Sequence, residues 1–497
     1  MTKNRRRVSY TAGMAKRRSA SRSHSRPHPG RAPRVIILAA GLGARMRSTL
    51  PLVLHRIAGR TLIDTILDTA EALSPSEVVL ILGASRGQVE PTIEGRRVTI
   101  GETNTRDGSA RWLLGALDGK SSDLESVLVL PADAPNLVAD TLARLIARQQ
   151  DAKLDLALLS FRPPDSAEWN RVVRDRGGRV RRIVPPIEGS VRARSAAEAH
   201  SGIYCFRGPA LERALRQLAE RDPRADLTAT VEVLARGGKV EAMEAEDWRE
   251  AWSVRTRREL AAAEEIAHRR GIERALDAGA TLIDPATTRI DATVTIEPDC
   301  VIHPFVILQG RTSLQSGCEI HSFTRVADSR VGSGSVIFPH CDVEGATIGE
   351  RARVGPFARL RPGTVLEPDV RVGNFVETKE AALRRGVKAL HLSYLGDVEI
   401  GAGSNIGAGV ITCNYDGYVK NRTVVGPGAF IGSDSQLVAP VTVGEGAYVG
   451  AGSTITEDVP PGALSLTRAP QKNKEGWVAQ RRAARESKTG PGGSGSR

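Results

Sequence analysis

The sequence is short of aromatic residues and has no long apolar segment. Phe, Trp and Tyr together make up 4 % of the 497 residues. A core built from this chain therefore consists mainly of small aliphatic side chains. No apolar run reaches the length of about 20 residues that crosses a bilayer, and no signal-peptide core is recognisable. We therefore expect a soluble protein without a membrane span.

Cysteine is also scarce, and its spacing forms no known motif. The five cysteines are Cys205, Cys300, Cys318, Cys341 and Cys413. None belongs to a CxxC pair, which argues against a zinc ribbon or a thioredoxin-like redox motif. Free cysteines are typical of proteins in a reducing compartment, so we expect a cytoplasmic protein.

Acidic residues are absent from the start of the chain, and the net positive charge comes from the two ends. Residues 1–33 carry a charge of +10 and residues 478–497 a charge of +4, so the remainder of the +13 chain has a net charge of −1. Both segments are rich in Ser, Gly, Arg and Pro, and we expect two disordered tails. A start codon assigned too far upstream, an organellar transit peptide and a polyanion tether are alternative interpretations. We expect no specific binding of nucleic acid.

Residues 34–250 alternate between aliphatic runs and amphipathic segments, a pattern typical of a parallel α/β sheet. Strands are expected at Val35–Leu38, Val78–Leu82, Val127–Leu130 and Leu154–Leu159, and helices at Leu62–Leu73 and Thr141–Gln149. The first strand leads into a Gly-rich turn, Ala39–Gly43. Glycine lets main-chain N–H groups approach an anion, so this turn indicates a phosphate-binding loop. The segment is predicted to be an α/β Rossmann-like domain.

A different repeat begins near Thr281, where apolar residues recur every six positions. The longest register runs through Val425, Ile431, Leu437, Val443, Val449 and Ile455. Six residues match neither a helix nor a flat strand, but they suit a coil of three short faces around a narrow aliphatic core. We predict a parallel β-helix over residues 281–477, after a linker helix within residues 251–280 at Arg257–Leu276. The repeat is interrupted at 379–390 and 415–423, which we expect to form projecting loops.

Five motifs in this region are similar to those of one enzyme family. They are Gly355–Gly363 (GPFARLRPG), His391–Asp397 (HLSYLGD), Asn405–Gly409 (NIGAG), Ile411–Gly417 (ITCNYDG) and Gly432–Gly444 (GSDSQLVAPVTVG). The family is the bifunctional N-acetylglucosamine-1-phosphate uridylyltransferase / glucosamine-1-phosphate N-acetyltransferase of the GlmU type. The resemblance is close from about Gly349 to Trp477 and much weaker back to Val35. It implies a nucleotidyltransferase domain followed by a left-handed β-helix, a homotrimer, and a role in making UDP-N-acetylglucosamine for the cell wall.

The resemblance also implies roles for the polar residues of these motifs. His391 would remove a proton from the sugar amine before the amine attacks the thioester of acetyl-CoA, the co-substrate. Glu377 would orient or polarise this histidine, and Asn414 with the main-chain N–H of Tyr415 would bind the oxyanion. The residues expected to bind the sugar phosphate are Arg361, Lys379, Tyr394, Asn405 and Lys420, and those expected to contact acetyl-CoA are Ser433, Ala451 and Arg468.

The N-terminal segment resembles the same family in its first motif. Leu38–Met46 (LAAGLGARM) is similar to the signature of sugar-nucleotide pyrophosphorylases, which implies phosphate contacts for Gly41, Gly43 and Arg45. Asp133 lies where the family has an aspartate that binds Mg²⁺. Other positions differ from the family pattern. Leu52 replaces a lysine, and Arg255 replaces the asparagine that completes the metal site. Further departures lie at 106–111, 168–171 and 198–202.

These departures lead us to expect that uridylyltransferase activity is absent or strongly impaired. The domain would then be a scaffold or a non-catalytic sugar-nucleotide binding module. The alternative is a fully bifunctional enzyme, in which other cations such as Arg47 or Arg106 replace those that are missing.

Three histidines of the coil suggest an alternative function of a different class, that of a zinc-dependent carbonic anhydrase. His303, His321 and His340 lie about one coil apart. The sequence shows no close pair of histidines and no evident acidic partner for them, so we do not expect a zinc site.

Overall fold

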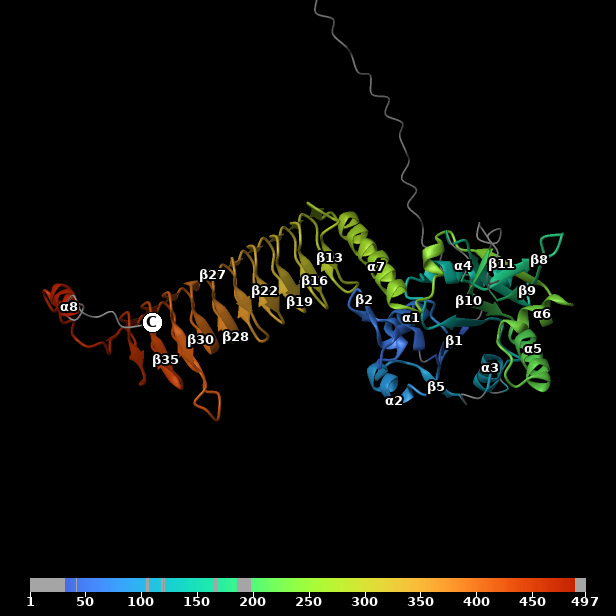
Figure 1. Ribbon diagram of the computed structural model, residues 1–497, viewed down its shortest axis with the longest axis horizontal. Helices are drawn as coiled ribbons and strands as arrows, with labels where there is room; N and C mark the ends of the chain where they lie inside the picture. The colour runs from blue at the N-terminus through green and yellow to red at the C-terminus, as the bar shows by residue number, and fades with distance from the viewer. Residues whose placement is uncertain are drawn as a thin grey trace, which may run out of the picture. The chain divides into compact units, whose positions relative to one another are not determined.

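The computed structural model of the chain describes residues 32–41, 43–103, 107–117, 119, 121–164, 168–185 and 198–487 (Figure 1). Its contacts divide the chain into two units. The first comprises Met1–His55 and Thr61–Leu260, and the second comprises Arg56–Arg60 and Ala261–Arg497. The expected disorder of residues 1–31 and 488–497 concerns segments outside the described residues.

The N-terminal unit contains a mixed sheet with nine described strands, in the order β11-β7-β10-β6-β1-β4-β5 and with β8 and β9 beside β10. The strands are β1 (Arg34–Ala39), β4 (Glu77–Leu82), β5 (Thr99–Glu102), β6 (Val127–Pro131), β7 (Leu156–Phe161), β8 (Arg171–Arg174), β9 (Val180–Val184), β10 (Ala199–Phe206) and β11 (Val240–Glu244). A separate pair, most of which belongs to the second unit, is formed by β2 (Arg56–Ile57) and β3 (Arg60–Thr61). The four expected strands correspond to β1, β4, β6 and β7.

The expectation of a wholly parallel sheet is wrong at β10. Strand β1 is parallel to β4 and β6, but β10 is antiparallel to β6 and β7. A parallel neighbour requires a crossover connection, usually a helix. The described residues between β7 and β10 instead contain the antiparallel pair β8–β9, which lets the chain return beside β7 in the opposite direction.

Helices cover both faces of this sheet because its strands are apolar on both sides. Val35 and Ile37 of β1 face one core, and Ile36 faces the other. The first core is covered by α1 (Leu62–Glu71), α2 (Arg86–Val89) and α4 (Ala139–Asp151), and the second by α3 (Ser109–Leu117), α5 (Gly208–Arg221) and α6 (Ala229–Ala235). Across the described part of the chain, no helix is long and apolar enough to cross a membrane.

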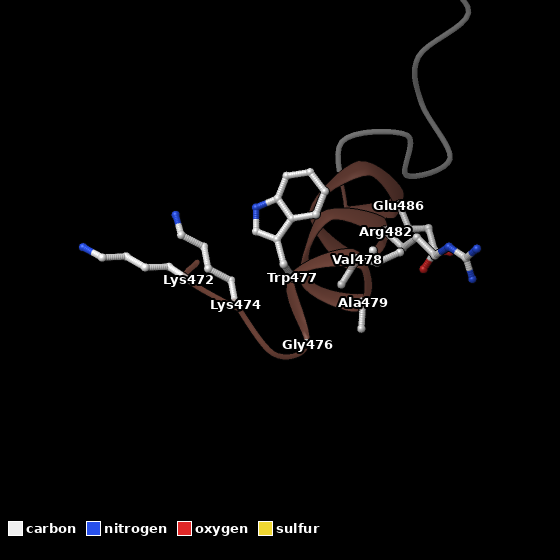
Figure 2. A pocket seen from close by; sticks show the side chains of 9 residues that line it. Lys472, Lys474, Gly476, Trp477, Val478, Ala479, Arg482 and Glu486 are labelled. Carbon is white, nitrogen blue, oxygen red and sulfur yellow. The ribbon is translucent and has the colours of Figure 1, made fainter. Parts of the chain in front are cut away.

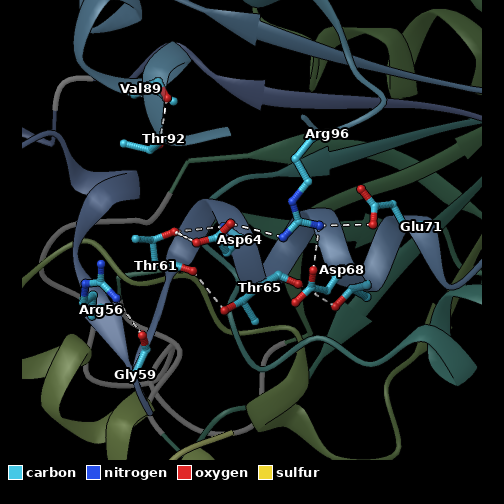
Figure 3. Close-up of polar contacts among 11 residues, drawn as sticks. Arg56, Gly59, Thr61, Asp64, Thr65, Asp68, Glu71, Val89, Thr92 and Arg96 are labelled. Carbon is cyan, nitrogen blue, oxygen red and sulfur yellow. Dashed lines mark hydrogen bonds and ion pairs between the residues drawn. The ribbon is translucent and has the colours of Figure 1, made fainter. Parts of the chain in front are cut away.

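Polar contacts fix both the start and the outer face of α1 (Figure 3). The Thr61 hydroxyl accepts a hydrogen bond from the N–H of Asp64 at 3.1 Å, as an N-cap residue does. Arg96 then forms ion pairs of 2.7–3.1 Å with three carboxylates of the helix, those of Asp64, Asp68 and Glu71. Because these carboxylates are three or four residues apart, they lie on one face of the helix.

The C-terminal unit is a left-handed parallel β-helix, whose short strands form two long sheets. One sheet contains β12 (Thr281–Leu282), β15 (Val301–Ile302), β18 (Glu319–Ile320), β21 (Val336–Ile337), β24 (Arg353–Val354), β27 (Arg371–Asn374), β29 (Lys388–His391), β31 (Asn405–Ile406), β34 (Phe430–Ile431), β37 (Tyr448–Val449) and β39 (Leu464–Ser465). The other contains β13 (Arg289–Ile290), β14 (Thr295–Ile296), β16 (Ile307–Gln309), β17 (Ser313–Leu314), β19 (Arg325–Ala327), β20 (Arg330–Val331), β22 (Asp342–Glu344), β23 (Thr347–Ile348), β25 (Arg359–Leu360), β26 (Val365–Leu366), β28 (Glu377–Leu383), β30 (Tyr394–Ile400), β32 (Ile411–Cys413), β33 (Thr423–Val425), β35 (Gln436–Val438), β36 (Val441–Val443) and β38 (Thr454–Ile455).

Stacked coils place equivalent apolar residues above one another in a single core. Ile302 pairs with Ile320, which in turn pairs with Ile337. Every member of the predicted register from Val425 to Ile455 is buried. The six-residue repeat is therefore confirmed as the signal of this core. All five cysteines of the chain are free thiols.

The two interruptions of the repeat have different structures. The segment between β32 and β33 forms a loop that projects from the coil, as expected (Figure 1). The segment 379–390 does not, because most of it belongs to β28 and β29. There the backbone continues the coil, with polar side chains on its outer surface. The six-residue pattern of apolar residues is therefore interrupted although the coil is not.

Helix α7 (Arg257–Asp277) confirms the helix predicted at Arg257–Leu276. It is attached to the first coil through His268, whose Nδ1 lies 3.1 Å from the main-chain oxygen of Ile290. The Nε2 of the same ring lies 2.9 Å from Oε1 of Glu264. This hydrogen bond raises the pKa of His268. A charged His268 therefore strengthens the attachment.

A further helix, α8 (Trp477–Glu486), follows the last coil with all its residues exposed. Figure 2 shows Trp477 beside Lys472 and Lys474, with Arg482 and Glu486 further along the helix. The expected disorder from residue 478 is therefore wrong as far as Glu486. The Ala and Arg residues of this segment have high helix propensity. The prediction of disorder was based on the composition of the whole tail and did not take this local preference into account.

Candidate active sites

His391 lies at the exposed end of β29 and is held by a residue of the preceding coil. Strand β27 pairs with β29 so that Asn374 stands opposite His391. Oδ1 of Asn374 lies 2.7 Å from Nδ1 of the ring. An amide oxygen only accepts hydrogen bonds, so Nδ1 carries the hydrogen and Nε2 is the basic nitrogen. Sequence reasoning missed Asn374, although it precedes His391 by 17 residues, the length of one coil.

Glu377, which we expected to orient His391, contacts a different residue. Its Oε1 accepts a hydrogen bond from Nη1 of Arg361 at 2.8 Å. Strand β28, which begins with Glu377, belongs to one sheet, whereas the strand that carries His391 belongs to the other. The orienting contact therefore comes from Asn374. Glu377 instead fixes the position of a cation.

The three cations expected to bind the sugar phosphate lie together. Strands β25 and β28 pair, which brings Arg361 next to Lys379 on neighbouring coils. The ammonium group of Lys420, on the projecting loop, lowers the pKa of Lys379, and the charge of Arg361 acts in the same direction, while Asp397 opposes both. A lowered lysine pKa shows that positive charge is concentrated here. Such a cluster favours the binding of an anion.

Tyr394 and Asn405 lie on coils next to those of Glu377 and His391, respectively. Tyr394 begins β30 and stands opposite Glu377 in the register. A Cβ atom at Gly396 would lie 2.5 Å from the Tyr394 phenol oxygen, so the phenol group packs closely against this glycine. Asn405 begins β31, which pairs with the strand that ends at His391. The structure thus brings the expected sugar-phosphate ligands onto a few successive coils.

Asn414 is buried at the start of the projecting loop. Its side-chain amide donates a hydrogen bond to the carboxylate of Asp397, and its main-chain oxygen accepts one from the N–H of Asn421 at 2.8 Å. The hydroxyl of the exposed Tyr415 donates to the Gly417 oxygen at 2.7 Å. These contacts fix the part of the loop expected to hold the oxyanion. Asp397, which ends the motif at 391–397, is a further residue that sequence reasoning missed.

The residues expected to contact acetyl-CoA form a small exposed surface near the end of the coil. Ser433 and Ala451 follow the paired strands β34 and β37. Nη1 of Arg468 donates a hydrogen bond to the main-chain oxygen of Ala451 at 3.0 Å. A Cβ atom at Gly432 would lie 2.5 Å from the nitrogen of Ala451, so only glycine allows successive coils to approach this closely. The result is a strip of main chain and small side chains next to a cation.

In the N-terminal unit, the Gly-rich turn contacts an apolar residue where a lysine was expected. Gly43 has a φ of 65°, and a Cβ atom there would lie 2.6 Å from Cβ of Leu52. Leu52, in the 3₁₀ turn Leu52–Leu54, is buried. Gly41 is exposed, with open space around its Cα atom. The turn therefore has room for a ligand but gains no charge from Leu52. Leu42 and Arg106 lie outside the described residues.

A cavity of about 500 Å³ next to this turn is lined by Arg45, Asp133 and Arg255, among others. Oδ1 of Asp133 is buried and has no hydrogen-bond partner among the described residues. Burial raises the pKa of Asp133 to about 6, against the opposing effects of the Ser253 hydrogen bond and the Arg255 charge. The carboxyl group therefore loses its proton at a higher pH than an ordinary aspartate.

The second position expected to bind Mg²⁺ near Asp133 carries a cation instead of an oxygen ligand. Mg²⁺ is usually bound by one or two carboxylates together with water and substrate phosphates. At the position of the second expected ligand, the guanidinium of Arg255 pairs with Glu259 at 2.7 Å and lies 4.1 Å from the ring centre of Trp169. A fixed cation at this place repels a metal ion and offers it no oxygen.

Comparison with known proteins places both units in one family. The family described as "MobA-like NTP transferase domain" matches residues 35–277, and "Bacterial transferase hexapeptide (six repeats)" matches residues 422–457. A protein of Koribacter versatilis named "Bifunctional protein GlmU" is 38 % identical over 461 residues, which cover 91 % of this chain and 98 % of that protein. This chain belongs to the GlmU family.

Other GlmU proteins give the same result. The protein of Trichlorobacter lovleyi is 40 % identical, over 90 % of this chain and 98 % of its own length. The protein of Streptomyces avermitilis is 41 % identical, over 90 % of this chain and 94 % of its own length. The GlmU resemblance seen in the motifs is confirmed. The similarity also extends across the N-terminal unit, where the motifs alone indicated a weak relationship.

Proposed function

We propose that the C-terminal unit transfers the acetyl group of acetyl-CoA to the amine of glucosamine-1-phosphate. The product, N-acetylglucosamine-1-phosphate, is a precursor of UDP-N-acetylglucosamine. The observation that carries this proposal is the pair His391–Asn374, which leaves a basic Nε2 on the same group of coils as the cations Arg361, Lys379 and Lys420. A base beside an anion-binding cluster suits an amino sugar phosphate.

His391 acts as the general base. The ammonium group of the sugar has no lone pair, so it must lose a proton before it can attack the thioester. Nε2 accepts this proton, and the hydrogen bond from Nδ1 to Asn374 stabilises the imidazolium that forms. A new N–C bond then forms, the C–S bond breaks, and the CoA thiolate leaves. The nitrogen loses its second proton to give the amide, and the thiolate takes up a proton to give the free thiol.

The loop that begins at Asn414 stabilises the transition state. Negative charge develops on the carbonyl oxygen of the acetyl group as the amine attacks. The amide of Asn414 and the main-chain N–H of Tyr415 are the donors we assign to it. Asp397 holds the Asn414 side chain in place, and pre-positioned donors cost no reorganisation during the reaction.

The remaining residues bind the two substrates. Arg361, oriented by Glu377, binds the phosphate together with Lys379 and Lys420. Tyr394 and Asn405 position the sugar by hydrogen bonds. Acetyl-CoA lies along the strip at Ser433 and Ala451, where main-chain groups accept an extended ligand, and Arg468 is available to one of its phosphates.

We propose that the protein is a homotrimer, as the family resemblance implies. An exposed stack of aromatic rings along one edge of the coil supports self-association. Its members are Phe305, Phe323, His340, Phe357 and Phe375, with successive ring centres 4.8–5.2 Å apart. Its four phenylalanines are about half exposed in the single chain, and an exposed apolar surface of this length is typical of a protein interface.

The acetyltransferase proposal is tested by incubating the purified full-length protein with acetyl-CoA and glucosamine-1-phosphate. We expect one thiol released for each N-acetylated sugar phosphate formed. Glucosamine without the phosphate should be a much poorer substrate, because it cannot use the cation cluster. Equal rates with the two sugars would contradict the assigned role of that cluster.

A second candidate function is uridylyl transfer in the N-terminal unit. The relatives are named bifunctional, which favours a second activity, and the comparisons give no support to its loss. The surroundings of Asp133 and the buried Leu52 favour weak turnover with Mg²⁺ in this chain. Pyrophosphate release from UTP and N-acetylglucosamine-1-phosphate, with Asp133→Ala as control, measures it directly. Fast release that depends on Asp133 would show a fully bifunctional enzyme.

A further inference from the structure

Two histidines and a glutamate converge on the first coils of the β-helix. His303 follows β15 and His321 follows β18, and these two strands pair with Val301 opposite Glu319. The two imidazole rings stack with their centres 4.3 Å apart and an angle of 17° between their planes. Oε1 of Glu319 lies 3.0 Å from Nε2 of His303 and 3.2 Å from Nε2 of His321.

This cluster differs from what the sequence led us to expect. We found no close pair of histidines and no acidic partner, yet the register between coils provides both. His340 is not a member. It stacks instead between Phe323 and Phe357, with ring centres 5.0 and 4.8 Å away. The cluster shares no residue with the acetyltransferase site.

We propose that His303, Glu319 and His321 bind a divalent transition-metal ion of the Zn²⁺ class. Imidazole nitrogen and carboxylate oxygen are ligands that such ions prefer. One ligand atom from each residue lies within 4.8 Å of the other two. Donor atoms bound to Zn²⁺ at about 2.0–2.2 Å in tetrahedral geometry are about 3.3–3.5 Å apart. The two distances to Glu319 already approach this value. The stacked rings must turn out of their parallel arrangement so that a nitrogen lone pair of each histidine points at the ion.

The cluster is accessible to an ion from solvent. The side chains of His303 and His321 are 23 % and 24 % exposed, and that of Glu319 is 40 % exposed. Three protein ligands leave a fourth position for water. On one side, the ring of Phe338 covers His321 at a centre distance of 5.6 Å. This contact limits the directions in which the His321 ring can turn away from Glu319.

A metal ion here would join two successive coils near the end of the solenoid. Coils at an end have fewer neighbours than those in the middle, so their stability depends more on each contact. Binding to the folded state stabilises a protein by RT ln(1 + [L]/Kd). A bound ion therefore raises the resistance of the β-helix to unfolding without taking part in acetyl transfer.

The test uses tag-free, full-length protein from which metal has been removed with EDTA. Zn²⁺ binding is measured by equilibrium dialysis and by titration calorimetry. We expect one Zn²⁺ per chain and a higher melting temperature with Zn²⁺. His321→Ala and His303→Ala should each weaken binding at least tenfold, and Glu319→Gln should weaken it less. His340→Phe is the matched control, since it removes a neighbouring imidazole outside the cluster, keeps a ring in the aromatic stack and should leave binding unchanged.

Two measurements keep the result unambiguous. Acetyltransferase activity and circular dichroism show whether each variant is folded. Co²⁺ titration of the unsubstituted protein reports tetrahedral coordination by its visible absorption. Cys300→Ser with Cys318→Ser should retain the absorption, because the buried thiols beside the two strands are not ligands. No stoichiometric binding, no Co²⁺ spectrum, or unchanged binding in His321→Ala would overturn the proposal.

Discussion

Oδ1 of Asn374 accepts a hydrogen bond from Nδ1 of His391 at 2.7 Å, although the two residues lie on different coils. This contact fixes the ring and its tautomer, and it makes Asn374 a positioning residue for the proposed base.

Asn374→Ala should lower kcat about 10- to 100-fold and change the KM for glucosamine-1-phosphate little, because the base loses its orientation while the phosphate contacts remain. Asn374→Asp places a carboxylate beside the ring and favours the imidazolium, so the acid limb of the kcat profile should move to higher pH. Steady-state kinetics between pH 5.5 and 9 measures both effects. Arg385→Ala, which removes a surface cation paired with Asp369, is the control. Unchanged profiles in both Asn374 variants would exclude the positioning role.

The ion pair of Arg361 with Glu377 leads to a prediction about substrate affinity. Arg361→Ala should raise the KM for glucosamine-1-phosphate at least tenfold, because a charge-assisted hydrogen bond contributes about 1.5–3 kcal/mol. Glu377→Gln should also raise KM, since the guanidinium loses its fixed position. A similar KM for acetyl-CoA in both variants serves as the internal control. A fall in kcat alone in Glu377→Gln would indicate a direct catalytic role instead.

The lowered pKa of Lys379 predicts a pH dependence of phosphate binding. Lys379 binds phosphate best in its protonated form, so affinity is present below its pKa and is lost as pH rises through it. Lys420→Ala removes the neighbouring charge that lowers this pKa, and the loss should then occur at higher pH. The inhibition constant of inorganic phosphate, measured from pH 7 to 10.5, tests the shift. A midpoint that moves to lower pH in Lys420→Ala would contradict the arrangement.

The guanidinium beside Asp133 leads to a prediction for the N-terminal unit. Arg255→Asn replaces a cation by an oxygen ligand and should increase Mg²⁺-dependent pyrophosphate release. Acetyl transfer should stay unchanged and report that the protein is folded. If the unsubstituted chain is already fast and Arg255→Asn is slower, Arg255 itself belongs to the uridylyltransferase machinery.

The exposed aromatic stack predicts an effect on assembly. Phe323→Glu places a charge within the stack and should reduce the molar mass measured by light scattering towards that of a monomer. Lys388→Glu, on an exposed strand position away from the stack, should leave the mass unchanged. An unaltered trimer in Phe323→Glu would place the interface elsewhere on the coil.

The sequence predicted those features that depend on local repetition. The register from Val425 to Ile455 identified the coil because each face repeats the same six-residue unit. Helix α7 was predicted from the composition of its own residues. Contacts between coils were harder to predict. Asn374 and Glu319 find their partners through the register of stacked coils, and successive coils here differ in length. The direction of β10 likewise depends on the intervening pair β8–β9 rather than on its own residues.

In the mechanism that we propose, His391 is the base of an acetyl-CoA-dependent N-acetyltransferase. Its most direct test compares His391→Ala with the unsubstituted protein in thiol release at saturating acetyl-CoA and glucosamine-1-phosphate. We expect kcat to fall by at least two orders of magnitude, with a nearly unchanged KM and partial recovery at high pH, where the free amine is more abundant. Full activity of His391→Ala at neutral pH would show that His391 is not the base.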